Sequence, residues 1–458
     1  MRAFARQMAE RMKAVAAAGA VAAFWLAVWV FAAALVAQPL ILPGPGTVAV
    51  ALLRLVCDVG TWAILVDSGA RILGGLALAA ACGGVMAGAS VRSLTFARLV
   101  APALSFVKAT PVACVVVLLL IWLGSARVSV AAVFLMALPG VYFSLVEGLA
   151  QVDKPLEQMF RLHGVRGWRL FCAHTWREVL PFVLSCARAV IGMSWKAGVA
   201  AELIGMAVGT VGERIYQAKL LIETADLLAW TVLVVAASWA CERVLVWLLR
   251  ASGPVAWRTA VRAHGHGLRG RTGAASDGAA AELALAVGDR APWAPALDGL
   301  VLHVPAGGRT CVMGASGVGK STLLALAAGE CAPCSMVFQD VRLVEDASAL
   351  DNVLVCADAR VYASSAAALL RLLVPGIDVH ARVAELSGGQ RRRVEIARAL
   401  LCPGGAVILD EPFTGLDIAA RDACAEVVLD LLDGRMLLLA THDAADARAL
   451  DISDIITL

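Results

Sequence analysis

Charged residues are scarce in this sequence. Asp, Glu, Lys and Arg make up 16% of its 458 residues, whereas hydrophobic residues make up 60%. A soluble domain carries about 25% charged residues on average, so this composition excludes a wholly soluble protein. The long uncharged runs lie almost entirely between Met1 and Leu249, and the remainder has the composition of a soluble α/β domain. The formal net charge of +3 favours no particular class of partner.

A disulfide framework is also missing. The twelve cysteines follow no disulfide-framework spacing, and many of them stand inside apolar runs. This usage is typical of small buried side chains in a reducing compartment. Cys331-Ala-Pro-Cys334 is a single C-x-x-C pair, and no second pair stands at metal-ligand spacing. Its isolation argues against zinc binding or redox chemistry at that pair.

Six apolar runs are long enough to cross a bilayer. The first follows a basic segment at residues 1–13. A cleaved signal peptide is the competing interpretation of that run, but the run is longer than the usual hydrophobic region of such a peptide. The predicted spans are residues 14–37, 72–91, 99–123, 128–146, 179–201 and 227–249.

The basic residues predict the orientation of these spans. An even number of spans places both termini on one side of the membrane. The N-terminal segment, Arg92, Arg98, residues 154–177 and Arg250 all fall on that side, which the positive-inside rule assigns to the cytoplasm. We therefore expect a multi-pass protein of the cell (inner) membrane, with both termini and the soluble part in the cytoplasm.

Three basic residues stand inside the predicted spans. Lys108-Ala-Thr-Pro111 interrupts the third span, and Arg188 and Lys196 lie in the fifth. A charge near the bilayer centre costs about 2.5–3.5 kcal/mol, so such a side chain faces a bundle interior or a cavity. The alternative is that each side chain reaches toward the interface.

The longest cytoplasmic segment between spans is residues 147–178. Leu156, Phe160 and Trp168 are interleaved there with charged residues, which predicts a helix, a turn at Gly164 and a second helix. Such an amphipathic elbow either docks into the groove of a partner or lies on lipid headgroups.

Residues 251–281 are rich in Gly, Ala, Arg and His without apolar periodicity, and we predict a linker there. The predicted domains are a cytoplasmic segment (1–13), a membrane domain (14–250) and a soluble domain (282–458).

The soluble domain contains a phosphate-binding loop. Gly314, Gly319, Lys320 and Ser321 fall on the spacing G-x-x-x-x-G-K-[ST]. In this motif the backbone N–H groups wrap a polyphosphate, while the lysine reaches its β/γ oxygens and the hydroxyl contacts Mg²⁺. A β-prone run precedes the loop and helix formers follow it, so the phosphates are expected to face a helix N-terminus.

Further motifs follow in a fixed order. Ser387, in the stretch Leu386-Ser-Gly-Gly-Gln390, precedes a predicted helix and forms a second anion site at a helix N-terminus. Residues 406–411 form a buried strand that ends in Asp410, suited to Mg²⁺, and Glu411, suited to polarising a water. Gln339 can reach the metal or that water from a loop, and His442 can hydrogen-bond a γ-phosphate.

These motifs resemble those of the ATP-binding cassette (ABC) family. By this resemblance, residues 314–322 are Walker A, Gln339 the Q-loop, residues 386–390 the signature, 407–411 Walker B, 415–417 the D-loop and His442 the switch histidine. The family implies ATP and Mg²⁺ as cofactors and a head-to-tail dimer in which each ATP lies between Walker A of one copy and the signature of the other. The implied catalytic residues are Glu411, His442 and Gln339, and the implied Mg²⁺ ligands are Ser321, Gln339 and Asp410. The implied ATP-binding residues are Gly314, Ser316, Gly317, Gly319, Lys320, Ser321, Thr322, Ser387, Gly388, Gly389, Gln390 and Asp417.

The membrane half resembles the permease of binding-protein-dependent importers, of the nitrate/sulfonate/taurine type. The similar stretches are residues 42–45, 68–75, 108–113, 122–124 and 195–202. Residues 147–178 resemble the family's cytoplasmic coupling loop, which docks on the ATPase. The implied partners are a second copy of the chain, membrane lipid, an extracytoplasmic binding protein and a small polar or anionic solute or vitamin precursor, with no nucleic acid.

The sequence departs from the family in four places. Glu157-Gln-Met159 stands where the family usually has Glu-Ala-Ala, which predicts different docking contacts. Only 18 residues separate Lys320 from Gln339, about half the usual gap, so a β-hairpin is missing at the edge of the domain. The adenine-stacking aromatic is not at its usual place, and Trp293 is the nearest candidate. Permease and ATPase are also fused in one chain.

The sequence thus predicts a six-helix, all-α transmembrane domain followed by an α/β P-loop ATPase. We expect a homodimeric importer driven by ATP hydrolysis. Two alternatives stay open. An ABC exporter usually has long cytoplasmic extensions of its spans, whereas the loop at residues 91–98 is short. A membrane ATPase that acts on a partner without transport would not need Arg188 and Lys196.

Overall fold

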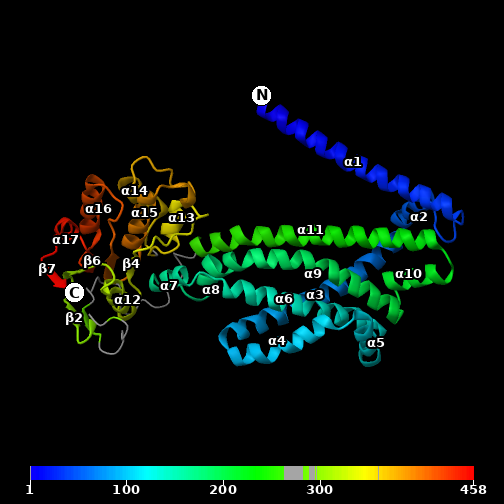
Figure 1. Cartoon of the computed structure of the whole chain (residues 1–458), viewed down its shortest axis with the longest axis horizontal. Helices are drawn as coiled ribbons and strands as arrows, with labels where there is room; N and C mark the ends of the chain where they lie inside the picture. Colours follow the sequence, from blue (N-terminus) through cyan, green and yellow to red (C-terminus); the bar gives the residue numbers. More distant parts are fainter. Residues whose placement is uncertain (1, 263–281, 288–293, 295–296, 359) are drawn as a thin grey trace. The chain divides into compact units, whose positions relative to one another are not determined.

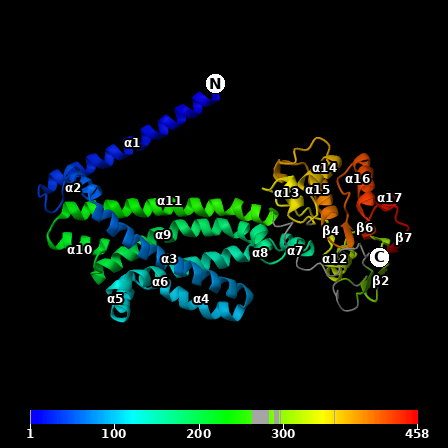
Figure 2. The same cartoon turned by 180° about the vertical axis from the view of Figure 1, so that it is seen from behind.

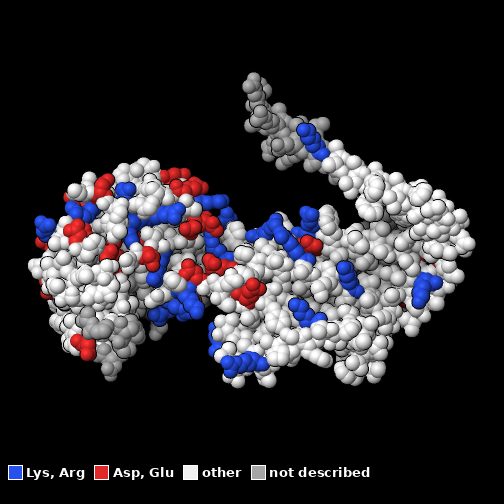
Figure 3. Space-filling model, in the orientation of Figure 1, with Lys and Arg blue, Asp and Glu red and all other residues white. Residues whose placement is uncertain are grey.

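The computed structural model describes residues 2–262, 282–287, 294, 297–358 and 360–458. These residues form two compact units (Figure 1). The helical unit contains residues 1–150 and 179–251, and the second unit contains residues 151–178 and 252–458. The second unit therefore combines the coupling loop with the ATPase domain. Charged side chains gather over the second unit, whereas the visible face of the helical unit carries few (Figure 3).

Nine helices build the helical unit within the described residues (Figures 1 and 2). They are α1 (Arg2–Val36), α2 (Pro45–Cys57), α3 (Val59–Arg92), α4 (Leu94–Ala109), α5 (Val112–Leu123), α6 (Ser125–Ala150), α9 (Trp176–Gly205), α10 (Val211–Leu220) and α11 (Thr224–Arg262). Five are long and apolar enough to cross a membrane, and the count rises to six if α4 and α5 form one span. This agrees with the predicted helical membrane domain.

The third predicted span is bent. Helices α4 and α5 meet at 103° across Thr110 and Pro111. Proline supplies no N–H to the preceding turn and disfavours helical backbone in the residue before it, which explains the break. The apolar run at residues 99–123 is therefore a broken span or a re-entrant loop rather than one straight helix.

Small residues let the long helices approach one another closely. A Cβ added at Gly75 of α3 would lie 2.5 Å from the carbonyl oxygen of Val130 on α6. A Cβ added at Gly198 of α9 would lie 2.5 Å from Ile72 Cγ1 on α3. Small side chains at helix contacts are typical of membrane bundles, where close backbone packing replaces the hydrophobic effect.

The coupling loop folds as a helical elbow, as predicted. Helix α7 (Lys154–Leu162) ends before Gly164, which has a φ of +79°, and α8 (Gly167–Leu170) continues through a π-helical turn (η1, Phe171–Thr175) into α9. Leu156, Met159 and Phe160 are buried in the hydrophobic core of the ATPase unit. The amphipathic face of α7 thus packs on protein rather than on lipid headgroups.

A parallel sheet forms the centre of the ATPase domain (Figure 2). Its strands are β3 (Arg309–Met313), β4 (Ser335–Val337), β5 (Ala406–Asp410), β6 (Met436–Thr441) and β7 (Asp454–Thr457), in the order β4-β5-β6-β3-β7. Antiparallel β1 (Leu283–Ala286) and β2 (Val301–Val304) form a second, small sheet. Strands β5 and β6 are buried along their whole length, which explains their continuous apolar sequences.

Helices surround this sheet. They are α12 (Lys320–Glu330), α13 (Ala349–Leu354), α14 (Ala363–Leu373), η5 (Val383–Glu385, 3₁₀), α15 (Gly388–Leu401), α16 (Ile418–Leu431) and α17 (Ala444–Ala449). Helix α12 ends four residues before β4 begins, so the shortened segment between Lys320 and Gln339 contains no hairpin. The α/β fold predicted for this half is confirmed.

The linker predicted at residues 251–281 begins later than expected. Helix α11 continues to Arg262, and residues 263–281 lie outside the described part of the chain. Trp257 and Ala260 are buried in the ATPase unit. This burial stabilises the last turns of α11, whose sequence lacks the apolar periodicity that would predict a helix. Trp293 also lies outside the described residues.

Candidate functional site

Three neighbouring strands bring the predicted phosphate-site motifs to one edge of the sheet. Strand β6 lies between β3 and β5, with Thr441 in register with Met313 and Ala440 in register with Asp410. The loop after β3 starts at Gly314, β5 ends at Asp410, and His442 follows β6. The carboxyl ends of parallel strands are where α/β sheets bind ligands. We call residues 314–322, Gln339, Asp410, Glu411 and His442 the nucleotide edge.

The loop at residues 314–320 is built around glycines. Gly319 caps α12 with a φ of +113°, a conformation that residues with a side chain rarely adopt. Lys320 is 5% exposed, and its Nζ donates hydrogen bonds to the carbonyl oxygens of Gly314 (2.8 Å) and Ala315 (3.0 Å). Ser316, Gly317 and Ser321 are exposed and Thr322 is partly buried. The lysine side chain therefore spans the loop, from the first residue of α12 to the carbonyl oxygens at the start of the loop.

Asp410 supplies an oxygen that can bind a metal. The residue is 3% exposed, and its Oδ1 has no hydrogen-bond partner among the described residues. Burial raises the pKa of Asp410, while a hydrogen bond with the Ser321 side chain opposes that shift. An unpaired carboxylate oxygen beside a serine hydroxyl is a donor set that suits Mg²⁺. These two residues therefore fit the predicted metal site.

Glu411 is held in a strained conformation. Its φ is +45°, and its backbone N–H donates to the carbonyl oxygen of Ala440 at 2.9 Å. Its Oε1 lies 3.3 Å from Nδ1 of His442, whose side chain is exposed. A left-handed backbone at a residue other than glycine costs about 1–3 kcal/mol and persists where the surroundings enforce it, often at active sites. The structure thus brings these two predicted catalytic residues together.

Gln339 lies at the same edge, and no hydrogen bond of its side chain with the other predicted residues is found in the described part of the chain. It follows β4, the neighbour of β5, and its side chain is exposed. Its backbone oxygen accepts a hydrogen bond from Nη2 of Arg392. That bond fixes the position of the loop while leaving the amide side chain free to turn toward a ligand.

The predicted second anion site forms a helix cap. Ser387 Oγ accepts a hydrogen bond from the N–H of Gln390 (3.3 Å), and Gln390 Oε1 accepts one from the N–H of Ser387 (2.9 Å). This capping box starts the 14-residue helix α15. Ser387 and Gly388 are exposed, and Gly389 is partly buried. Asp417 caps α16 through a 2.7 Å bond from the N–H of Ala420. No contact of residues 387–390 with the loop at 314–322 is found in the described part of this single chain.

The buried face of α15 carries a charge network that the sequence did not reveal. Arg392, Glu395 and Arg398 are at most 5% exposed. Glu395 pairs with Arg392 (2.9 Å) and Arg398 (3.3 Å), while Arg392 donates to the carbonyl oxygens of Phe338 and Gln339. Charged residues at this spacing usually form a solvated helix face. The local sequence therefore does not distinguish a buried charge network from a solvent-exposed one.

The same network reaches the coupling loop through Arg342. The N–H of Arg342 donates to Glu395 Oε1 (3.2 Å), and its guanidinium stacks on Phe338 at 3.7 Å. Nη1 donates to the carbonyl oxygen of Pro155 (3.1 Å) and to Gln158 Oε1 (3.5 Å). Gln158 is one of the residues at which the sequence departs from the family pattern, and its side-chain amide oxygen accepts one of these hydrogen bonds.

Further contacts hold the remainder of the coupling loop. Nη2 of Arg169 donates to the carbonyl oxygen of Val355 (2.7 Å), Arg177 pairs with Asp346 (3.1 Å), and the Leu162 carbonyl accepts from Cys334 N–H (3.0 Å). We call the contacts between residues 153–178 and the ATPase domain, together with Arg392, Glu395 and Arg398, the docking seam.

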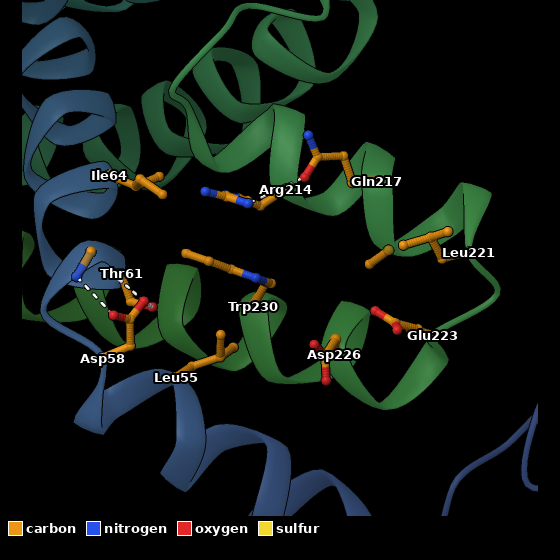
Figure 4. Close-up of a pocket in the computed structure, with 12 residues that line it drawn as sticks. Leu55, Asp58, Thr61, Ile64, Arg214, Gln217, Leu221, Glu223, Asp226 and Trp230 are labelled. Carbon is orange, nitrogen blue, oxygen red and sulfur yellow. Dashed lines mark hydrogen bonds between the residues drawn. The ribbon is translucent and has the colours of Figure 1, made fainter.

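The helical unit contains a cavity of about 300 Å³ between α2, α3, α10 and α11 (Figure 4). Its lining combines the apolar Leu55, Ile64 and Trp230 with the polar Asp58, Arg214, Gln217, Glu223 and Asp226. In the predicted topology these helix ends lie on the extracytoplasmic side. No local sequence pattern predicts this cavity, because its residues come from four separate elements.

The basic residues predicted inside spans are exposed in this single chain. Arg188 and Lys196 stand eight positions apart on α9, which places them about 80° apart around the helix axis, and Lys108 lies at the end of α4. Glu202, on the same helix, is instead fully buried and accepts bonds from Ser68 Oγ (2.9 Å) and from Gly212 N–H (3.3 Å). Glu202 thus fastens α10 to α3 and α9.

Two family models match the chain. Residues 80–255 match the binding-protein-dependent transport system inner membrane component, and residues 297–414 match the ABC transporter ATP-binding domain. The aliphatic sulfonates import ATP-binding protein SsuB of Escherichia coli K12 is 36% identical over 176 residues, which cover 34% of this chain and 68% of that protein. SsuB 1 of Rhizobium johnstonii is 37% identical over 33% of this chain and 64% of its own length. The chain thus spans about two thirds of the curated relatives that it matches.

Solved structures give a weaker likeness. The dimeric ATP-binding cassette MJ0796 in a post-hydrolysis state with ADP and Pi is 25% identical, with a TM-score of 0.32, over 36% of this chain and 86% of that chain. A putative ABC transporter ATP-binding protein from Pyrococcus furiosus is 17% identical, with a TM-score of 0.30, over 35% of this chain and 88% of that chain.

Proposed function

The chain belongs to the ABC transporter family, and from this premise we propose that two copies form an importer that uses ATP hydrolysis to move a small solute into the cytoplasm. The observation that carries the proposal is the combination, in one polypeptide, of a permease-type membrane domain and the nucleotide edge. Two chains supply two membrane domains and two ATP sites.

The nucleotide edge supports a specific division of roles. Backbone N–H groups of residues 314–322 and the Lys320 ammonium hold the phosphates of ATP. Ser321 and Asp410, with Gln339, hold Mg²⁺, which when bound neutralises charge on the phosphates. Glu411 accepts the proton of the attacking water, and His442, 3.3 Å from Glu411, donates a hydrogen bond to the γ-phosphate.

The exposed N-terminus of α15 supports the homodimer. Ser387 and Gly388 are exposed, and the 14-residue helix behind them presents its positive dipole end to the surface. In the proposed dimer, this second phosphate-binding surface contacts the ATP that Lys320 of the other copy holds. Asp417, at the exposed start of α16, then lies close to the same interface.

The membrane part supports a pathway for a polar or anionic solute. Arg188 and Lys196 occupy an exposed face of α9 inside a candidate span. A cation on a lipid-facing surface is costly, so we propose that this face lines the pathway between two copies. Sulfonate, the anion named for the SsuB relatives, belongs to the solute class that this charge favours. An extracytoplasmic binding protein delivers the solute.

The proposed location is the inner membrane, with the ATPase domain in the cytoplasm, where ATP is available. The start of α1 carries the basic segment, and the last part of α11 carries Arg250 and Arg262. The positive-inside rule assigns both to the cytoplasmic side. In this topology the coupling loop also faces the cytoplasm. Because the loop is continuous along the chain with α9, movement of the ATPase domains can pass into that membrane helix.

A trapping experiment tests this proposal. Glu411→Gln should bind ATP without hydrolysing it, and we would purify this variant in mild detergent with ATP and Mg²⁺ from the native host. Mass spectrometry would then identify any extracytoplasmic protein that co-purifies and any small molecule bound to it. Recovery of such a protein with Glu411→Gln but not with Lys320→Ala supports import. Its absence from an intact, ATP-loaded dimer would favour export or a non-transporting role.

A further inference from the structure

A histidine and two cysteines meet inside the docking seam. His163 ends α7 of the coupling loop, Cys356 follows α13, and Cys402 ends α15. One ring nitrogen of His163 and the two sulfur atoms all lie within 4.8 Å of one another. The three residues are 1%, 2% and 4% exposed, respectively. None of them belongs to the nucleotide edge, and the coupling loop supplies the histidine while the ATPase domain supplies both thiols.

The histidine is arranged as a ligand. Depending on the ring tautomer, its Nε2 accepts a hydrogen bond from the N–H of Met336 (3.1 Å) or donates one to the Met336 carbonyl oxygen (3.2 Å). Its buried Nδ1 has no hydrogen-bond partner among the described residues. If Nε2–H donates to the carbonyl, the Nδ1 lone pair is available. Metal-binding histidines typically donate their other N–H to a backbone carbonyl in this way, which fixes the ring and its tautomer.

Three arginines carry positive charge near the two sulfur atoms. Arg398 interacts electrostatically with both cysteines, Arg169 also interacts with both, and Arg435 interacts with Cys402. Nη2 of Arg169 donates to the carbonyl of Val355, the residue before Cys356, at 2.7 Å. Thiolates, not thiols, bind metals, so binding of the metal at this cluster releases the thiol protons.

The donor set selects the class of metal. Two thiolates and an imidazole suit thiophilic ions such as Zn²⁺ and Cu⁺, whereas Mg²⁺ and Ca²⁺ prefer oxygen ligands. With Zn–S distances of about 2.3 Å and Zn–N of about 2.0 Å, tetrahedral ligand atoms lie roughly 3.5–3.8 Å apart. Separations of up to 4.8 Å therefore require only a small contraction of three side chains.

We propose that His163, Cys356 and Cys402 form a buried binding site for a thiophilic cation, Zn²⁺ or Cu⁺, that fastens the coupling loop to the ATPase domain. The site adds a coordinate link to the hydrogen bonds of Arg342 and Arg169 in the docking seam. It is separate from the isolated pair Cys331 and Cys334. The proposal does not depend on the direction of transport or on the solute.

The test uses the full chain in detergent, without an affinity tag, treated with a chelator and kept reduced. Co²⁺ is the spectroscopic probe, and Zn²⁺ is the competitor. We expect one Co²⁺ per chain, a strong thiolate-to-cobalt absorption band that Zn²⁺ abolishes, and a higher midpoint of thermal unfolding with metal. Loss of an outer-shell partner already weakens metal binding by about 10–100-fold, so His163→Gln and Cys402→Ser should weaken Co²⁺ binding by at least that factor.

Matched controls separate the site from general thiol binding. Cys424→Ser removes another buried cysteine, and Cys331→Ser disrupts the C-x-x-C pair. Both variants should retain the absorption band at full intensity. Unfolding midpoints measured in chelator show whether each ligand variant is folded, and Cys356→Ser serves as a third ligand variant.

Three results would overturn the proposal. The first is a wild-type chain without the thiolate-to-cobalt band. The second is unchanged Co²⁺ affinity in folded His163→Gln. The third is a disulfide between Cys356 and Cys402 in protein whose thiols were blocked directly in the cells, because oxidised sulfurs cannot bind the metal.

Discussion

The nucleotide edge and the docking seam lie in the same compact unit, yet their buried carboxylates differ in how they are paired. At the nucleotide edge, Asp410 Oδ1 has no partner, Glu411 is strained at a φ of +45° and His442 is exposed. In the docking seam, Glu395 is fully buried and pairs with two arginines. The first region keeps groups available for a ligand at the expense of stability. The second uses partnered charges to hold segments together.

The comparison predicts that changes at the nucleotide edge abolish activity while the fold remains intact. The largest effect should come from Lys320→Ala. Without the ammonium that spans residues 314 and 315, we expect loss of detectable ATP binding and of hydrolysis. Binding of a fluorescent ATP analogue and circular dichroism measure the two properties. Measurable ATP-driven transport by this variant would refute the role of the site as the motor.

Glu411→Gln should separate binding from chemistry. Loss of a general base lowers the rate by about 10²–10⁴-fold, whereas the phosphate contacts of residues 314–322 remain. We therefore expect ATP to bind normally and to persist unhydrolysed. Phosphate release and retained nucleotide check this, and normal turnover by the variant would contradict the assignment of Glu411.

Changes in the docking seam should act on stability instead. Glu395→Ala leaves Arg392 and Arg398 buried without their carboxylate, and breaking a buried ion pair in this way costs about 3–5 kcal/mol of unfolding free energy. Denaturant unfolding of the full chain in detergent measures the loss. Glu426→Ala, at an exposed position on α16, is the matched control, with an expected change within about 0.5 kcal/mol. Equal free energies of unfolding for Glu395→Ala and Glu426→Ala would contradict the stabilising role of the docking seam.

The smallest effect should come from Arg342→Ala. It removes the hydrogen bonds to Pro155 and Gln158, and a bond from a charged donor contributes about 1.5–3 kcal/mol. Amides of α7 should then exchange with deuterium roughly tenfold faster, while those of residues 314–322 keep their rates. Arg371→Ala, exposed on α14, should leave both regions unchanged. Faster exchange confined to residues 314–322 would contradict the assignment of Arg342 to the seam.

The two regions also differ in how far the sequence predicts them. The nucleotide edge was predictable because phosphate and metal chemistry fixes residue types at short spacing, as in Gly314 to Ser321. The buried network of Arg392, Glu395 and Arg398 was not, because a charged helix face has the same pattern whether water or protein covers it. His163, Cys356 and Cys402 are far apart in the sequence, and only the docked coupling loop brings them together.

The membrane half shows a similar limit. Apolar runs predicted its helices, and Pro111 marked the interruption of the third span. The angle of 103° at that break and the extension of α11 to Arg262 depend on packing that composition does not express. The cavity lined by Asp58, Arg214 and Trp230 likewise arises from four elements whose arrangement no local pattern encodes.

The central claim, that two chains hold ATP between residues 314–322 of one copy and Ser387 of the other, can be tested by native mass spectrometry. Glu411→Gln released from detergent after incubation with ATP and Mg²⁺ should carry two ATP molecules per two chains. Addition of Ser387→Arg should keep the two-chain complex and lose the retained ATP. Two retained ATP molecules in the double variant, or retained ATP on single chains, would contradict the account.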